Sequence, residues 1–308
     1  MGCHDGFDDC NGGASDGCET DLTTEAHCGT CDTACAPTYR FASMACELCP
    51  LALAGAEGVP LGKAHYALAV ADLDGDGDRD LATTAFIGGG LAVSLNAGNG
   101  TFGPVTTYLA STSLASVVAG DFDQDADVDL AVVGDAFLGP SDLTLLLNAG
   151  NGTFKTSIPL GTSLTGLLAV GDVNGDARPD LLGFDHGLTD VKALLGTGTA
   201  CFTPEAADYA DDKYPFFCGL EVADLDKDGR ADFVLLLSDS KTPGNRVLKF
   251  YRRNKANNGF DFLTERVFSG ADLAGLTLRD FDGDGASDTA IVDKVASRLL
   301  VYMNKGGG

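Results

Sequence analysis

The sequence contains no tryptophan and has only three methionines and four histidines among 308 residues. It is also poor in basic residues, with 20 lysines and arginines against 45 aspartates and glutamates, and its formal net charge is −25. Because so acidic a surface repels phosphate, we expect no nucleic-acid partner. No apolar run is long enough to cross a bilayer, so we expect no membrane insertion. The surplus of negative charge attracts cations instead.

The scarce histidines do not indicate catalysis, because none of them stands in a metalloprotease or hydrolase motif. What the chain has in abundance is glycine, with 41 residues, beside a hydrophobic content of 44%. That content is enough to bury a core. Many glycines between short apolar runs favour turns and strands over long helices, so we predict an all-β protein.

Eight of the ten cysteines fall within residues 1–49. They are Cys3, Cys10, Cys18, Cys28, Cys31, Cys35, Cys46 and Cys49. An even, dense set in a short segment predicts disulfides and an oxidising compartment, extracellular or at the cell surface. The sequence itself carries no export signal. The CxxC pairs at 28–31 and 46–49 leave a zinc site as the alternative. A bond between Cys201 and Cys218 stays open.

The composition changes near Pro50, which divides the chain into a Cys-rich segment at 1–50 and a repetitive region at 51–308. An acidic segment recurs five times in the second region, with starts 49, 51, 52 and 56 residues apart. Short apolar runs precede and follow each copy, and a third run and a Gly-rich turn come next. A fourth strand follows the turn, as at 105–109. One repeat is therefore about four antiparallel strands, the size of a propeller blade.

Each acidic segment carries Asp or Asn at positions 1, 3 and 5 and Asp at position 9. Four crowded acids destabilise one another unless a cation neutralises them. Calcium takes six to eight oxygen ligands, which this spacing and a position-7 carbonyl supply. The predicted ligands are Asp72, Asp74, Asp76, Asp80, Asp121, Asp123, Asp125, Asp129, Asp172, Asn174, Asp176, Asp180, Asp224, Asp226, Asp228, Asp232, Asp280, Asp282, Asp284 and Asp288. We expect about five calcium ions.

The loops differ from EF-hands and from one another. An EF-hand needs a Glu at position 12, where this chain has Thr83, Val132, Gly183, Leu235 and Ile291. The third loop has Asn174 in place of an acid and Ala177 where a sharp turn prefers glycine. We therefore predict that the third loop binds calcium most weakly.

The pattern D-x-D-G-D-G-x-x-D, the apolar strand after it and N-x-G-x-G-T-F resemble the FG-GAP/VCBS repeat family, which includes integrin α-subunit heads. The resemblance covers roughly residues 60–308. It implies a β-propeller with calcium in the loop between the first two strands of each blade. It implies no single activity.

The family usually has seven blades, whereas five motifs occur here. The last repeat stops after its third strand, and residues 58–62 (GVPLG) resemble 157–161 (SIPLG), which lie in a fourth strand. The N-terminal strand would then complete the last blade and close a five-bladed ring without exposed edges. A fragment of a seven-bladed propeller is the alternative.

Residues 1–50 resemble Cys-rich segments of secreted myxobacterial proteins. We expect a monomeric binding or adhesion module for an extracellular protein or glycan, with structural calcium. The alternatives are a spacer within a larger secreted protein and a polysaccharide-active enzyme. A basic cluster at 241–266 indicates either a dock for an anionic partner or a strand face that balances nearby acids.

Overall fold

The computed structural model describes the strand backbones at 7–8, 20–21, 39–42 and 45–48, Leu61, and residues 65–305 apart from 86, 111, 135–141, 162–163, 186–189, 206–208, 211–215, 239–241 and 243. Its contacts divide the chain into two units, Met1–Gly58 and Val59–Gly308. The predicted boundary after residue 50 stays a prediction.

The first unit contains two short antiparallel pairs. Strand β1 (Phe7–Asp8) pairs with β2 (Thr20–Asp21), and β3 (Tyr39–Ala42) pairs with β4 (Ala45–Leu48). The side chains of the eight N-terminal cysteines lie outside the described residues. Disulfides, and zinc as their alternative, therefore stay predictions.

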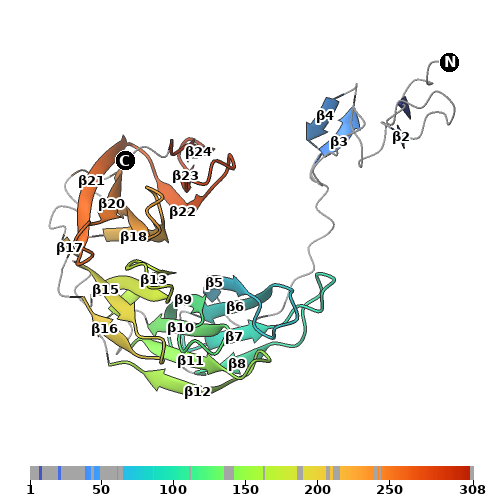
Figure 1. Ribbon diagram of the computed structural model, residues 1–308, viewed down its shortest axis with the longest axis vertical. Coiled ribbons are helices and arrows are strands. Elements are labelled where there is room, and N and C mark those ends of the chain that lie inside the picture. Colours follow the sequence, from blue (N-terminus) through green and yellow to red (C-terminus); the bar gives the residue numbers. More distant parts are fainter. Residues whose placement is uncertain are drawn as a thin grey trace. The chain divides into compact units, whose positions relative to one another are not determined.

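The second unit is built from five antiparallel sheets (Figure 1), and no described residue belongs to a helix. The first sheet holds β5 (His65–Ala71), β6 (Asp80–Ala85), β7 (Gly90–Ser94) and β8 (Thr106–Tyr108). The second holds β9 (Leu114–Gly120), β10 (Asp129–Gly134), β11 (Thr144–Asn148) and β12 (Phe154–Pro159). The third holds β13 (Leu164–Gly171), β14 (Asp180–Asp185), β15 (Asp190–Gly196) and β16 (Phe202–Pro204), with β17 (Tyr209–Ala210) also paired to β15.

The last two sheets follow the same order along the chain. The fourth holds β18 (Phe216–Ala223), β19 (Asp232–Ser238), β20 (Asn245–Arg253) and β21 (Phe260–Ser269). The fifth holds β22 (Leu273–Arg279), β23 (Asp288–Asp293) and β24 (Arg298–Tyr302). Each sheet is a meander in which neighbours in sequence pair with one another. These sheets are the blades of a propeller, so the predicted all-β fold of about five blades is confirmed. The fifth blade has three strands among the described residues. The closing strand at 58–62 falls mostly outside those residues and stays a prediction.

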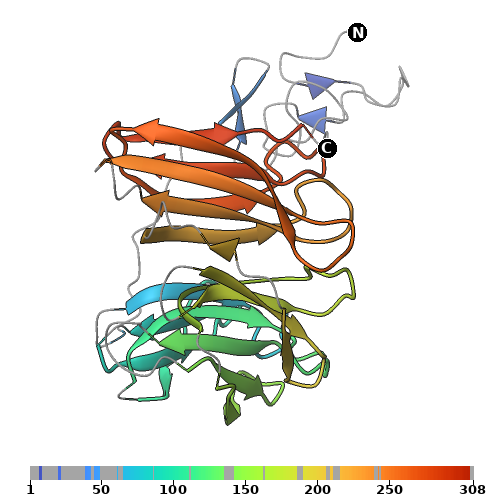
Figure 2. The same cartoon turned by 90° about the vertical axis from the view of Figure 1, so that its left-hand side faces the viewer.

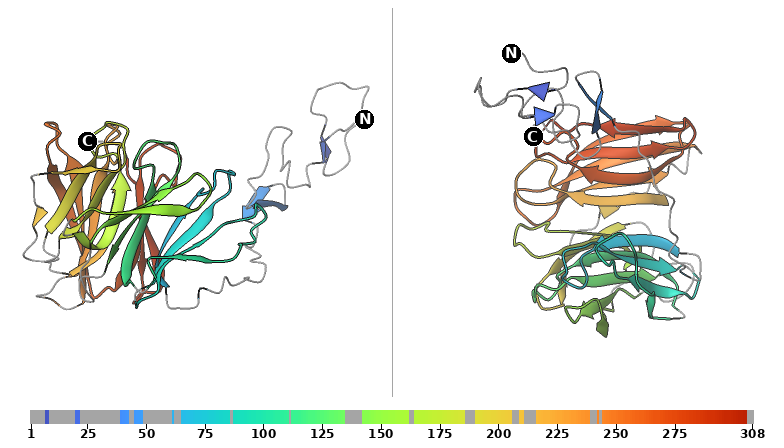
Figure 3. Two further views of the ribbon diagram at one scale, coloured as in Figure 1. Left: turned by 90° about the horizontal axis from the view of Figure 1, so that it is seen from below. Right: turned by 90° about the vertical axis from the view of Figure 1, so that its right-hand side faces the viewer.

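The blades stack through their first strands, because β5 contacts β9, β9 contacts β13, β13 contacts β18, and β18 contacts β22. Figures 2 and 3 show the same sheets from the sides. Four apolar clusters fill the four junctions between consecutive blades. The junction of the third and fourth blades, for example, buries Phe184 with Phe233 and Tyr251. The hydrophobic core of this unit therefore lies between blades. Contacts across the junctions between blades are expected to dominate the stability of the fold.

Candidate metal centres in the blade loops

The five acidic segments are the loops between the first and second strands of each blade, as the repeat pattern predicts. Loop 1, for example, starts after β5 ends at Ala71 and leads into β6 at Asp80. Such a loop needs left-handed backbone at positions 4 and 6, where Gly75 and Gly77 have φ of 77° and 94°. Ala126 and Ala177 hold the same position-6 conformation in loops 2 and 3, with φ of 75° and 63°. An alanine is strained there.

Among the described residues, carboxylates gather in four groups, and within each group one oxygen from every carboxylate lies within 4.8 Å of the others. Each group contains positions 1, 3 and 9 of one loop. The groups are Asp72, Asp74 and Asp80; Asp121, Asp123 and Asp129; Asp224, Asp226 and Asp232; and Asp280, Asp282 and Asp288. The structure thus brings together three of the four predicted side chains in loops 1, 2, 4 and 5.

The position-5 side chains lie outside these groups. The carboxylates of Asp76 and Asp125 each accept a hydrogen bond from the backbone N–H two residues later, at 2.9 Å. In loop 4, Asp228 accepts the same backbone bond at 3.0 Å and also pairs with the side chain of Arg230 at position 7. This guanidinium lowers the pKa of Asp228. Position 7 had been expected to act through its carbonyl alone. A calcium-ligating role for position 5 stays a prediction.

Loop 3 differs through its asparagine. The amide nitrogen of Asn174 donates to Asp176 at 3.1 Å, and Arg178 pairs with the same carboxylate at 3.4 Å. Both donors contact the same oxygen, Oδ2 of Asp176. Loop 4 has a similar arginine pair at Asp228 but keeps an acid, Asp226, at position 3. This arrangement agrees with the expectation that loop 3 is the weakest calcium site.

Burial and neighbouring acids disfavour the charged forms of two acids in these groups. Burial, then Asp80 and its other acidic neighbours, raises the pKa of Asp74, and burial followed by Asp125 raises that of Asp123. One carboxylate oxygen of Asp123 is buried without a hydrogen-bond partner. A buried acceptor of this kind costs free energy unless something binds it. A set of hard oxygen ligands that includes a buried acceptor fits Ca²⁺, which would supply the compensating charge when bound.

Position 9 has a second role that the spacing did not show. Asp80 accepts hydrogen bonds from the backbone N–H of Leu73 in its own loop and of Asn96 after the third strand, both at 2.7 Å. The same two bonds recur at the other four position-9 acids, Asp129, Asp180, Asp232 and Asp288. All five side chains are fully buried. Position 9 therefore clamps the loop to the blade.

Burial makes three of these acids harder to ionise. It raises the pKa of Asp129, Asp180 and Asp232 to about 6, against the opposing effect of their backbone hydrogen bonds. The pKa of Asp288 is lowered instead, by the N–H groups of Phe281 and Asn304. Desolvation is weaker there because the adjoining Phe281 is 48% exposed.

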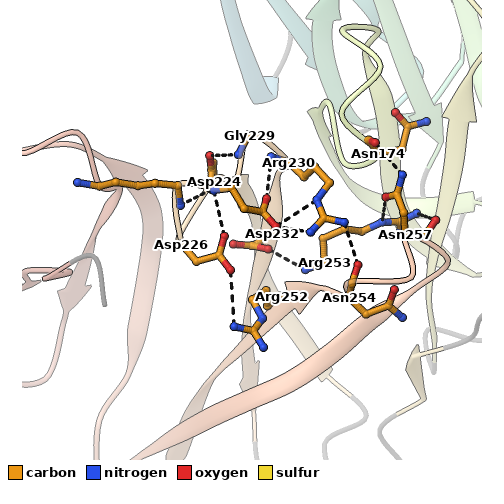
Figure 4. A network of polar contacts seen from close by, with 12 residues as sticks. Asn174, Asp224, Asp226, Gly229, Arg230, Asp232, Arg252, Arg253, Asn254 and Asn257 are labelled. Atoms are coloured by element: carbon orange, nitrogen blue, oxygen red, sulfur yellow. Dashed lines mark hydrogen bonds and ion pairs between the residues drawn. The ribbon is translucent and has the colours of Figure 1, made fainter. Parts of the chain in front are cut away.

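Loop 4 is surrounded by cations of its own chain (Figure 4). Arg252 lies 3.6 Å from Asp226, and Arg230 also donates to the carbonyl of Asn254 at 2.9 Å. Arg253 is 1% exposed and pairs at 2.8 Å with Glu205, which follows the last strand of the preceding blade. Its backbone N–H donates to Asp232 at 2.7 Å. Loop 4 is thus tied to both neighbouring strands and the neighbouring blade.

The loops also hold the blades to one another, which sequence reasoning missed. The apolar residue at position 2 is buried in the junction with the next blade, as Leu73, Phe122, Val173 and Leu225. Its carbonyl accepts a bond from that blade at three junctions: from Asn148 to Leu73 at 2.7 Å, from Ala200 to Phe122 at 3.0 Å, and from Asn304 to Leu225 at 2.7 Å. At the remaining junction, Asn257 donates to the carbonyl of Asn174 at 2.8 Å. One sequence signal could have predicted such bonds between blades. It is the asparagine at the end of the third strand, the first residue of the N-x-G-x-G-T-F motif, as at Asn148.

A cavity of about 450 Å³ lies between the fourth and fifth blades. Its walls include Phe250, Arg252, Arg266 and Tyr302, and Asp226 of loop 4. The Arg266 guanidinium stacks over the Tyr302 ring at 4.5 Å. The cavity combines aromatic faces, hydroxyls and charged groups, which suits a polar ligand with an apolar face.

The basic cluster is for the most part neutralised locally. Arg246 pairs with Asp272 at 2.8 Å, Lys249 with Glu265 at 3.7 Å, and Arg253 with buried Glu205. These pairs favour the interpretation that the cluster balances nearby acids. Cys201, before β16, and Cys218, in β18, are both thiols and not a disulfide.

A family model for the FG-GAP-like repeat matches residues 72–132, 127–183 and 224–291, which together make up more than half of the chain and include all five loops. The chain belongs to this family. It is similar in structure to a lectin from Agrocybe aegerita. That lectin specifically recognises non-reducing terminal N-acetylglucosamine. The TM-score is 0.52 at 18% identity, over 80% of this chain and 65% of that one. A protein from Lactobacillus plantarum matches at 11% identity with a TM-score of 0.45, over 78% of this chain and 70% of that one. No curated protein matches.

The lectin likeness shows the fold alone, and the chain spans 65% of the lectin chain's length. The described residues contain no helix that is long and apolar enough to cross a membrane.

Proposed function

We propose that the protein is an extracellular binding module whose propeller is braced by about five calcium ions. The observation that carries this proposal is that the acidic loops of the first four blades each contribute a buried residue to a junction between blades. In four loops the acids at positions 1, 3 and 9 converge, and in loop 2 a buried oxygen of Asp123 lacks a partner. Calcium at these loops supplies counter-charge where the core residue at position 2 enters the next blade. Its role is structural, and the chain's own residues do the recognising.

We infer that the ligand is a glycan and that it binds between the fourth and fifth blades. The Phe250 ring lines the cavity and offers an apolar face on which a sugar ring can stack, in the absence of any tryptophan. The Tyr302 ring also lines the cavity and carries the Arg266 guanidinium over one face. Thr264 and Ser287 line the same cavity and offer hydroxyls. The exposed Arg266 guanidinium lies over Tyr302 and has further donors for hydroxyl or carboxylate oxygens. The lectin from Agrocybe aegerita supports this proposal to the extent that a related fold recognises a sugar.

The cavity shares one residue with a metal centre. Asp226 belongs to the loop 4 acid group, lines the cavity and lies 3.6 Å from Arg252, another wall residue. Whatever binds Asp226 therefore changes the charge that Arg252 presents to a ligand. We expect calcium and glycan binding to be linked, and by thermodynamic reciprocity each then alters the affinity for the other.

The test is a glycan array with calcium-loaded and calcium-depleted protein, followed by titration of any hit against two variants. Arg266→Ala removes a donor from the cavity, while Arg79→Ala removes an equally exposed arginine from the first blade. We expect calcium-dependent binding that Arg266→Ala weakens at least tenfold and Arg79→Ala leaves unchanged. If no glycan on the array binds with or without calcium, the result would favour the alternative that the protein is a spacer within a larger secreted protein. Hydrolysis of a polysaccharide on the array would favour the alternative that the protein is a polysaccharide-active enzyme.

A further inference from the structure

The chain's own cations are distributed unevenly over the five acidic loops. Among the described residues, no lysine or arginine forms an ion pair with an acid of loop 1 or loop 2. These two loops instead carry a fifth aspartate at position 7, Asp78 and Asp127. The last three loops have five such pairs, which are Arg178 with Asp176, Arg230 with Asp228, Arg252 with Asp226, Lys227 with Asp284 and Lys305 with Asp282.

The main cation of loop 5 comes from the preceding blade. Lys227 stands at position 4 of loop 4, and its ammonium group donates to the backbone carbonyl of Asp284 in loop 5 at 2.6 Å. A carboxylate oxygen of Asp284, the predicted position-5 ligand, lies 3.6 Å from the same Nζ atom. Lys305 pairs with Asp282 at 3.8 Å but is 79% exposed, so its pair contributes little. Lys227 therefore fixes a positive charge at a predicted metal centre of another blade.

Lys227 holds a backbone conformation that glycine adopts more easily. Its φ is 64°, and this position is glycine with φ between 76° and 79° in three other loops, as Gly75, Gly175 and Gly283. Gln124 in loop 2 is the other exception, with φ of 63°, and its side chain reaches Gly198 of the next blade. A left-handed conformation costs free energy for a residue with a Cβ, and such strain persists where other contacts compensate for it. The bond to Asp284 is that contact for Lys227.

We propose that Lys227 is a tethered counter-cation of loop 5, and that the chain's own cations divide the proposed calcium sites into two classes. In metal-free protein its ammonium group replaces part of the missing positive charge and links loop 4 to loop 5. When calcium enters loop 5, the same charge repels the ion and weakens its binding. Loops 1 and 2, without such a cation, bind calcium more tightly. The two classes rest on the proposed calcium sites, whereas the link in metal-free protein does not.

Melting in excess chelator tests the metal-free role of Lys227. Lys227→Gln removes the charge but keeps a side chain that loop 2 accommodates at the same position as Gln124. Lys227→Arg keeps the charge, and Lys155→Gln removes an exposed lysine from the outer strand of the second blade. We expect Lys227→Gln to lower the melting temperature by about 2–4 °C, with Lys227→Arg and Lys155→Gln close to wild type. Equal melting of Lys227→Gln and wild type would overturn the counter-cation.

Calorimetric calcium titration of the same variants separates a counter-cation from an ordinary surface ion pair. We expect Lys227→Gln to tighten one calcium site by about three- to tenfold, because it removes a repelling charge. The gain should disappear when Asp280→Asn disables the loop 5 site. Lys155→Gln should leave every site unchanged. A lower melting temperature without any change in calcium affinity would make Lys227 a structural contact only and overturn the proposal.

Hydrogen exchange of the wild-type protein, measured by mass spectrometry over a range of calcium concentrations, tests the two classes of site. We expect loops 1 and 2 to gain protection at lower calcium than loops 4 and 5. Equal midpoints in the four loops, or the reverse order, would overturn the two classes and leave the proposed function intact. A protein that binds no calcium would overturn the two classes together with the proposed function.

Discussion

Two aspartates of the same loop have different tasks, although the sequence presents them as equal ligands. Asp232 at position 9 is fully buried and holds two backbone N–H groups, at 2.9 and 2.7 Å from Leu225 and Arg253. Asp226 at position 3 faces the acid group and Arg252. A buried clamp is needed whether or not metal is present, while a ligand is needed only with metal.

We therefore predict opposite behaviour of two isosteric variants in metal-free buffer. Asp232→Asn should cost about 1–3 kcal/mol of unfolding free energy with or without calcium, because its amide cannot accept both N–H bonds. Asp226→Asn should be neutral or stabilising without calcium, since it relieves repulsion, and destabilising with it. Chemical denaturation in both buffers measures this. Equal losses for the two variants in metal-free buffer would contradict separate roles.

Position 6 supplies a second prediction at this scale. Ala126 has φ of 75° and Gly77, its counterpart in loop 1, has φ of 94°. Because a left-handed alanine costs about 1–2 kcal/mol, Ala126→Gly should stabilise the protein by roughly 1 kcal/mol and Gly77→Ala should destabilise it by a similar amount. Thermal melts at saturating calcium compare the two. The same sign for both variants would show that the turn does not govern loop stability.

At the scale of the element, the five loops are not equivalent sites. Loop 3 has Asn174 and a position-7 arginine, Arg178, that occupies Asp176. We predict that Asp172→Asn in loop 3 disturbs calcium-dependent stability less than Asp72→Asn in loop 1. Calorimetric calcium titration of the two variants tests the ranking. A larger loss of bound calcium from the Asp172→Asn variant than from the Asp72→Asn variant would contradict this ranking of the two loops.

Much of each blade was predictable from the sequence, because strand alternation and turn glycines are local signals. The strand–loop–strand order around Asp72–Asp80 and the turns at Asn99 and Asn151 follow from residues close together in the chain. The position-9 clamp was not predictable, since Asp129 reaches Asn148 across 19 residues. The hydrogen bond from the Asn148 amide to the Leu73 carbonyl was not predictable either, because it spans 75 residues and depends on how the blades stack. The pairing of Arg252 with Asp226 likewise needs the position of one strand against a loop.

At the scale of the whole molecule, the metal-free propeller should have an unusual pH dependence. Asp129, Asp180 and Asp232 have pKa values of about 6 when folded, against an ordinary value of 3.8. The folded state then binds more protons than the unfolded chain between about pH 4 and 6. The stabilisation from these three acids should therefore be greatest near pH 4 and be lost as the pH rises from about 4 to about 6.

Saturating calcium should reverse this trend, because protons compete with the cation for the same carboxylates. Melting temperatures from about pH 4 to 7, with and without calcium, measure both slopes. Parallel slopes in the two buffers would indicate that calcium and protons act on different groups.

The central claim is that divalent ions neutralise the crowded loops and thereby hold the blades together. Equilibrium dialysis of folded protein against millimolar calcium, with melts of the same samples before and after chelation, tests it most directly. The account predicts about five bound ions and a melting temperature that drops by more than 10 °C on chelation, since each site at tenfold excess adds about 1.4 kcal/mol. Folded protein that binds no calcium and melts unchanged in chelator would contradict it.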